Sequence, residues 1–213
     1  NDRASLEDIE EALATMSEQH FAQEYLAQFT SFEGQVFKSF VKERDIFYLD
    51  GIDLNGCDAY IGYDVGFRDP SACVVILVDM GSGIHYIVDA WQEGNLSTAD
   101  QAAKVKASME IWDADFIYID SAAAQMKHDF AVLYDIMCIN ADKSILDGVG
   151  YLTMMFEQGR LKVADHLEDF IIALTNARWD TDSQREKLKH EDSFIHYMDA
   201  FRYGVYTARH QVG

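Results

Sequence analysis

Residues 59–91 read AYIGYDVGFRDPSACVVILVDMGSGIHYIVDAW and predict three consecutive β-strands. The apolar runs cover residues 59–63, 72–78 and 85–91, and glycines and an Asp-Pro pair separate them. Because the connections are short, we expect the strands to form an antiparallel meander. This meander decides the fold class, because it places a sheet at the centre of the chain.

The residues after the meander alternate between helix and strand patterns. A helix with Ser97 or Thr98 as its N-cap is expected to run to Trp112. The next expected elements are a strand at 116–119, a helix at 125–134, a strand at 136–139 and helices at 145–157, 167–176 and 193–209. The predicted fold is α/β: a mixed sheet of three antiparallel strands and then parallel strands, flanked by helices. This is the element order of the ribonuclease H-like fold.

The segment before the meander has a different pattern. Residues 5–29 carry apolar side chains at helical spacing, and residues 30–55 mix turn residues with short apolar pairs. We interpret residues 1–55 as a helical lead-in and linker, and residues 56–213 as the main domain. A chain of 213 residues, 49% of them hydrophobic, is long and apolar enough to bury a substantial core.

The charge of the chain is strongly negative, with 37 acidic and 17 basic residues and a formal net charge of -20. A domain that grips DNA by itself is usually basic, because neutralising phosphates supplies most non-specific affinity. Charge alone therefore predicts weak DNA binding. It also leaves open an acidic, solubilising surface on a protein that never contacts nucleic acid.

The cysteines and the apolar runs indicate where such a protein works. Cys57, Cys73 and Cys138 are odd in number and widely spaced, so they suggest neither a disulfide framework nor a metal knuckle. No apolar run reaches the roughly 18 to 20 residues of a membrane span. We therefore expect a soluble protein in a reducing cytoplasm, with no membrane partner.

Three aspartates stand where the predicted topology brings chain segments together. Asp64 ends the first strand, Asp120 ends the fourth, and Asp199 lies on the last helix. If the first and fourth strands are parallel neighbours, Asp64 and Asp120 emerge side by side, and a helix across that edge can aim Asp199 at them. Crowded carboxylates repel one another unless divalent cations neutralise them, and oxygen ligands suit Mg²⁺ or Mn²⁺. Two such ions can drive phosphodiester hydrolysis.

Each aspartate also has a purely structural interpretation. Asp64 precedes a turn, where Asp is common, and Asp120 can cap the following helix. Asp199 can form an i,i+3 salt bridge with Arg202. These alternatives stay open at the level of sequence.

Other polar residues are weaker candidates for the same site. His196 lies one turn before Asp199, Asp69 and Asp192 offer outer carboxylates, and Lys143 can reach a phosphate. A structural histidine is at least as natural an interpretation of His196, and a solvated surface lysine is the simpler interpretation of Lys143. The densest positive stretch, a possible DNA-contacting hairpin, consists of Arg178, Arg185, Lys187, Lys189 and His190.

Taken in order, these segments resemble the nuclease half of the large terminase subunit of tailed bacteriophages. The similar segments are FAQEYLAQF (21–29) with VF (36–37), YIGYDVGFRDPSA (60–72), FIYIDSAAA (116–124), KSILDGVGYLTMMFEQGRLKV (143–163) with ARWD (177–180), and HYMDAFRYG (196–204). Each is short, but together they cover nearly the whole chain in the family's order. The first of them resembles the segment that joins the ATPase motor to the nuclease.

The resemblance implies a function and a set of site residues. Asp64, Asp120 and Asp199 would bind two divalent cations, Mg²⁺ or Mn²⁺, in an endonuclease that cuts double-stranded viral DNA concatemers during genome packaging. The partners implied are the ATPase half of the same subunit, the small terminase subunit and the portal, in the host cytoplasm. The chain itself lacks a GxxxxGK[ST] loop, so we expect no ATP hydrolysis.

One departure and two rival functions remain. The family often has an Asp immediately before the signature histidine, but this chain has Ile195, so that carboxylate is absent or replaced, for example by Asp192. The rivals are another ribonuclease H-like nuclease, of the resolvase or transposase type, and a non-catalytic acidic docking module.

Overall fold

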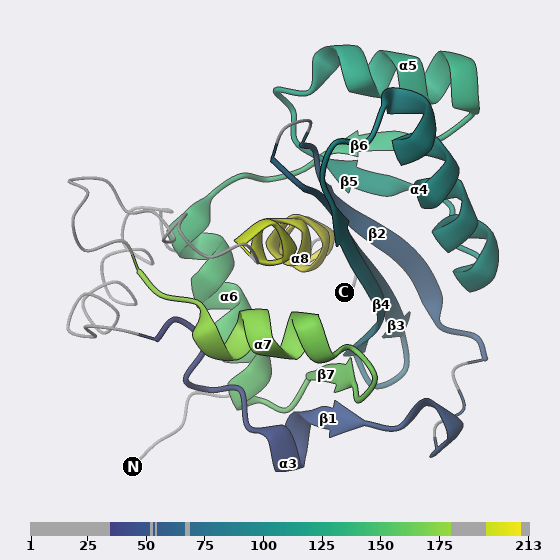
Figure 1. Cartoon of the computed structure of the whole chain (residues 1–213). Helices are drawn as coiled ribbons and strands as arrows, with labels where there is room; N and C mark the ends of the chain where they lie inside the picture. Colours follow the sequence, from purple (N-terminus) through teal and green to yellow (C-terminus); the bar gives the residue numbers. More distant parts are fainter. Residues whose placement is uncertain (1–34, 52, 54, 67–68, 180–194, 210–213) are drawn as a thin grey trace, which may run out of the picture. The chain divides into compact units, whose positions relative to one another are not determined.

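A computed structural model describes residues 35–51, 53, 55–66, 69–179 and 195–209 (Figure 1). The contacts within the chain divide it into two units, Asn1–Gly34 and Gln35–Gly213, and all described residues belong to the second. The helices predicted within residues 5–29 therefore lie outside the described residues.

The described residues form a mixed α/β structure, as the sequence predicts. The strands are β1 (Ile46–Phe47), β2 (Asp58–Asp64), β3 (Ser71–Asp79), β4 (Ile84–Glu93), β5 (Ile117–Ile119), β6 (Cys138–Asn140) and β7 (Leu161–Ala164). The helices are α3 (Lys42–Asp45), α4 (Thr98–Trp112), α5 (Ala124–Tyr134), α6 (Ile145–Glu157), α7 (Glu168–Asn176) and α8 (Ile195–Ala208), with a 3-10 turn at Leu49–Gly51. Within the described part of the chain, no helix has the length and apolarity that a membrane crossing requires.

The strands form one sheet in the order β1-β7-β4-β3-β2-β5-β6. The pairs β2–β3 and β3–β4 are antiparallel, which confirms the predicted meander, and the remaining neighbours are parallel. Figure 1 shows α6, α7 and α8 on one face of the sheet and α4 and α5 on the other. With both faces covered, the central β3 is buried at every position except its last residue, which explains its continuous apolar run.

Local signals fix several element boundaries. The hydroxyl of Ser97 accepts a hydrogen bond from the backbone N–H of Asp100 (3.2 Å), and the Asp100 carboxylate accepts one from the N–H of Ser97 (3.3 Å). This capping box confirms the predicted start of α4. The helix predicted at 193–209 is observed as α8, and residues 193–194 lie outside the described part.

Two short strands, β1 at one edge of the sheet and β7 between β1 and β4, are not predicted by the sequence pattern. With two and four residues they are too short to show alternation, and each gains its place by pairing with a neighbour: Ile46 lies opposite Val163, and His85 opposite Leu161. The sheet therefore extends into the segment that we interpreted as a lead-in. The division at residue 55 remains a prediction, while the contacts divide the chain after Gly34.

Candidate active site

Asp64 and Asp120 occupy equivalent places on neighbouring strands. The parallel pair β2–β5 aligns Tyr63 with Ile119, and each aspartate is the next residue of its chain segment. Asp64 is the last residue of β2, and Asp120 directly follows β5. The sheet therefore delivers both carboxylates to the same edge, as predicted from the strand order.

A close approach between two backbones brings α8 to this edge. A Cβ atom on Gly62 of β2 would overlap the carbonyl oxygen of Ala200, and a Cβ atom on Gly204 would lie 3.2 Å from the Gly62 nitrogen. Only glycine at these two positions permits α8 to cross β2 so closely. The crossing places the first turns of α8, with Asp199, over the carboxyl end of β2.

A hydrogen bond joins the start of α8 to β2 directly. His196 donates from Nδ1 to Oδ2 of Asp64 over 2.8 Å, and both side chains are mostly buried. His196 was a weak candidate at the level of sequence, indicated by its spacing of three residues from Asp199 and by its place in the segment HYMDAFRYG. The structure shows that it contacts the first aspartate of the site.

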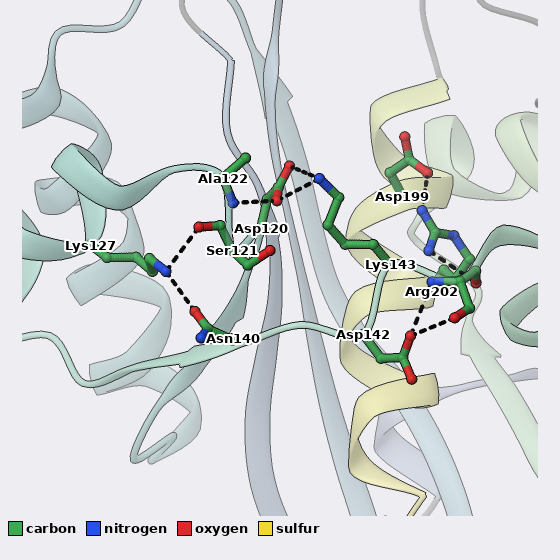
Figure 2. A network of polar contacts seen from close by, with 10 residues as sticks. Asp120, Ser121, Ala122, Lys127, Asn140, Asp142, Lys143, Asp199 and Arg202 are labelled. Carbon is green, nitrogen blue, oxygen red and sulfur yellow. Dashed lines mark hydrogen bonds and ion pairs between the residues drawn. The ribbon is translucent and has the colours of Figure 1, made fainter.

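Asp120 is held by its own turn and by a lysine. Its Oδ1 accepts the backbone N–H of Ala122 at 2.7 Å, and the Lys143 ammonium lies 2.8 Å from Oδ1 and 2.9 Å from Oδ2 (Figure 2). Asp120 therefore does not cap the following helix, because the N-cap of α5 is Ala123 and α5 has no side-chain cap hydrogen bond; Asp120 closes a turn with one of its two oxygens. Lys143, a solvated lysine in the simplest interpretation of the sequence, contacts both.

Asp199 forms the i,i+3 ion pair that its spacing predicted. Arg202 donates to Oδ1 of Asp199 at 2.7 Å and to the Ser144 carbonyl at 3.3 Å, and its side chain is only 3% exposed. The buried guanidinium ties α8 to the start of α6. It therefore fixes the position of Asp199 through one of its two carboxylate oxygens.

The three carboxylates share one electrostatic neighbourhood. Burial raises the pKa of Asp64, and the negative charges of Asp199 and Asp120 raise it further, although the His196 hydrogen bond opposes them. The pKa of Tyr203 on α8 is also raised, by burial first and then by Asp199, Asp64 and Asp120. Asp120 differs: burial favours its neutral form, but the hydrogen bonds from Lys143 and Ala122 prevail and lower its pKa.

The donor atoms at this edge suit a hard divalent cation, because they are carboxylate oxygens. With the side chains as they lie, no group of three His, Cys, Asp or Glu residues in the described part of the chain is gathered closely enough to hold a metal ion. Each aspartate is instead turned toward a basic partner. A shared ion would require Asp120 to give up part of its contact with Lys143.

The loops behind the carboxylates are braced by buried hydrogen bonds. Gln101 of α4 accepts from the Tyr63 hydroxyl (2.7 Å) and donates to the carbonyl of Gly66 (3.0 Å). The Ser71 hydroxyl donates to the same carbonyl and accepts from the N–H of Gly66. These contacts fix the chain immediately after Asp64. They were not predicted, because a glutamine in an amphipathic helix carries no signal of its partner.

The remaining candidates lie at the margin of the site. Asp69 is exposed, and its charge contributes to the raised pKa of His196, whose largest cause is the hydrogen bond to Asp64. Ile195, where the family often has a carboxylate, is buried. Asp192 and the basic stretch from Arg185 to His190 lie outside the described residues.

Comparisons with known proteins identify the family of this chain. The family model described as the terminase RNaseH-like domain matches residues 61–207. The chain is 38% identical over 216 residues to the large terminase subunit of Escherichia phage T5, a match that covers 97% of this chain and 49% of that protein. The chain therefore spans about half the length of this curated relative.

Solved structures of large terminases share the fold. The nuclease domain of the P22 large terminase matches with a TM-score of 0.67 and 18% identity, over 83% of this chain and 93% of that one. The large terminase nuclease of the thermophilic phage G20c, solved with bound magnesium, matches with a TM-score of 0.57 and 17% identity, over 79% of this chain and 96% of that one. At these identities the matches establish the ribonuclease H-like fold.

Proposed function

The chain belongs to the terminase RNaseH-like domain family, and from this premise we propose that it is a metal-dependent endonuclease that cuts double-stranded DNA. The observation that carries the proposal is the placement of Asp64 and Asp120 at register-matched ends of adjacent parallel strands, with His196 linking Asp64 to the helix that bears Asp199. A diffuse acidic surface does not explain why three carboxylates lie at one edge of the sheet.

Asp64, Asp120 and Asp199 would hold two divalent cations, Mg²⁺ or Mn²⁺. Bound ions of this kind activate a water and stabilise the departing oxygen of a phosphodiester. The carboxylate oxygens of the three aspartates suit such ions. Burial and then the neighbouring carboxylates raise the pKa of Asp64, and a bound cation would relieve the repulsion between the carboxylates. The magnesium in the related G20c nuclease supports the same class of metal.

The protein's own residues supply position and access. His196 orients Asp64, Arg202 orients Asp199, and the turn N–H of Ala122 orients Asp120. The small residues after Asp120, Ser121 and three alanines, leave room for a phosphate backbone to approach the edge. Orientation of this kind is the protein's main contribution to a metal-assisted hydrolysis.

The biological role follows from the family. The domain would cut viral DNA concatemers during genome packaging in the host cytoplasm, in the same subunit as an ATPase motor and alongside the small terminase subunit and the portal. Because the chain is strongly acidic, cleavage by this domain alone should be slow and should fall as salt rises. Partners that hold DNA against it would restore the rate.

Cleavage assays separate this function from its rivals. We expect the full chain to cut both supercoiled plasmid and linear duplex with Mn²⁺ or Mg²⁺, and to be inactive in EDTA. A resolvase would leave the linear duplex intact and cut branched DNA. A docking module would cut neither substrate, and Mn²⁺ titrated into it would show no binding that depends on Asp64 and Asp120.

A further inference from the structure

The pair formed by Lys143 and Asp120 occupies atoms that a metal ion would need. The ammonium lies within 2.9 Å of both Asp120 oxygens, and the N–H of Ala122 already uses Oδ1. A divalent cation on Asp120 and the Lys143 ammonium therefore compete for the same lone pairs. The stronger charge of the cation favours its taking the carboxylate.

The backbone beneath Lys143 is anchored, whereas its side chain is not enclosed. Asp142 accepts the N–H (3.0 Å) and the hydroxyl (2.8 Å) of Ser144 and pairs with Arg209 at 2.9 Å, and its own N–H donates to Thr207 at 2.9 Å. The Lys143 side chain is 44% exposed. Its ammonium can therefore leave Asp120 by rotation of the side chain alone, and it remains beside the sheet edge.

A second lysine nearby shows that the contact is specific. Lys127 donates to the Ser121 carbonyl (3.1 Å) and to the amide oxygen of Asn140 (2.6 Å), so it braces the loop after Asp120 without contacting the carboxylate (Figure 2). Both lysines carry one positive charge at the same edge of an acidic chain. Only Lys143 is placed to exchange with a cation.

We propose that Lys143 is a positioning residue that exchanges partners: it neutralises Asp120 in the metal-free protein and contacts a DNA backbone phosphate once a divalent cation takes that carboxylate. This inference rests on the proposed function. The substrate phosphate must approach Asp120 if it is to be cut there, and a lysine is a suitable point-charge partner for it. The same ammonium thus opposes metal binding and supports DNA binding.

The exchange makes metal and DNA binding cooperative. A bound cation releases Lys143 for DNA, and bound DNA holds Lys143 away from Asp120, so each ligand raises the affinity for the other by the same factor. Replacing Lys143 with an uncharged residue should therefore tighten metal binding and weaken DNA binding. A lysine with a merely structural role would not change the two affinities in opposite directions.

The test compares the full chain with Lys143→Met and, as the matched control, Lys127→Met. Mn²⁺ affinity is measured by calorimetry without DNA, and affinity for a labelled duplex of about 30 base pairs by anisotropy in EDTA and in Ca²⁺, with the duplex checked for integrity afterwards. We expect Lys143→Met to bind Mn²⁺ about two- to fivefold more tightly, the range for a partly exposed ion pair. In Ca²⁺ its duplex binding should weaken, and the slope against salt should fall by about one contact.

Each outcome is decisive. Unchanged or weaker Mn²⁺ binding by Lys143→Met overturns the exchange, and so does an equal change in Lys127→Met, which would indicate diffuse charge. If either result is found and the wild type still binds Mn²⁺ and cuts DNA, the proposed function stands without the exchange. Failure of the wild type to bind Mn²⁺ overturns both, and melting temperatures of the variants confirm that each is folded.

Discussion

Two regions of this molecule use aspartate in opposite ways. Asp45, at the end of α3, is fully buried and accepts hydrogen bonds from the Val41 N–H (2.8 Å) and from Arg44 (2.7 and 2.8 Å), with Lys162 at 3.7 Å. We call this group the Asp45 clamp. At the carboxyl ends of β2 and β5, by contrast, Asp64 and Asp120 are 13% and 22% exposed. Each of these two has a single basic side-chain partner among its described contacts.

The difference separates a structural carboxylate from an exchangeable one. In the Asp45 clamp every contact lies within the α3 turn or joins it to β7, so the charge stabilises the fold and has no access to a ligand. At the site, burial raises the pKa of Asp64 and the neighbouring carboxylates raise it further, which means that the fold tolerates a repulsion there. A protein retains such a repulsion where a cation or a reaction makes use of it.

The largest expected effect is on cleavage. Asp64→Asn and Asp120→Asn should each lower the cleavage rate at least about a thousandfold, because residues that act as one unit lose nearly all function singly. Without metal, the melting temperature of Asp64→Asn should stay level or rise, since a repelled charge is removed. A variant that cuts at the wild-type rate would show that the site lies elsewhere.

Substitution of Asp45 should have the opposite pattern of effects, lowering stability and preserving cleavage. Asp45→Asn should lower the free energy of unfolding by about 2 to 3 kcal/mol, somewhat less than for a fully buried pair because Arg44 is 39% exposed. Denaturant titration measures this loss, and cleavage per folded molecule at low temperature should remain. If Asp45→Asn and Asp64→Asn lost cleavage to a comparable extent, the distinction between a structural and an exchangeable carboxylate would be wrong.

Metal should stabilise the protein through the site and not through the clamp. At about ten times its dissociation constant, Mn²⁺ should add about 1.4 kcal/mol to the free energy of unfolding. The gain should persist in Asp45→Asn, shrink in Asp199→Asn, and fade as pH falls and the carboxylates protonate. Equal stabilisation by NaCl at matched ionic strength would indicate diffuse screening, with no shared site.

The smallest effect concerns the hydrogen bond between His196 and Asp64. The pKa of His196 is raised, mainly by that bond. The stabilisation that the bond gives to the folded protein is therefore fully present below the unfolded pKa of about 6.5, and it is lost as pH rises through the folded pKa. In EDTA, the stability difference between wild type and His196→Gln should therefore be about 1 kcal/mol or less at low pH and should shrink as pH rises above about 6.5. A difference that grows with pH would reverse the assigned sign.

The sequence predicted the meander and the mixed sheet, because apolar runs and short connections are local patterns. It predicted the alignment of Asp64 with Asp120 on the condition that the first and fourth strands are parallel neighbours, and β2 and β5 meet that condition. It did not predict β1 and β7, whose few residues acquire a conformation only by pairing. The same limit applies to the site: the partners His196 and Lys143 are 132 and 23 residues away from Asp64 and Asp120. Spacing along a helix identified His196 as a candidate, but no pattern in one sequence reveals which lysine reaches which carboxylate. The assignment of the three aspartates as metal ligands remains a prediction.

Anomalous diffraction from crystals of the full chain soaked in Mn²⁺ is the most direct test of the claim that these aspartates are exchangeable cation ligands. The expected result is manganese about 2.1 Å from carboxylate oxygens of Asp64 and Asp120, with Asp199 adjoining and the Lys143 ammonium displaced from Asp120. The Asp45 clamp should carry no manganese. Crystals that hold Mn²⁺ only at other surfaces, with Lys143 still paired to Asp120, would contradict it.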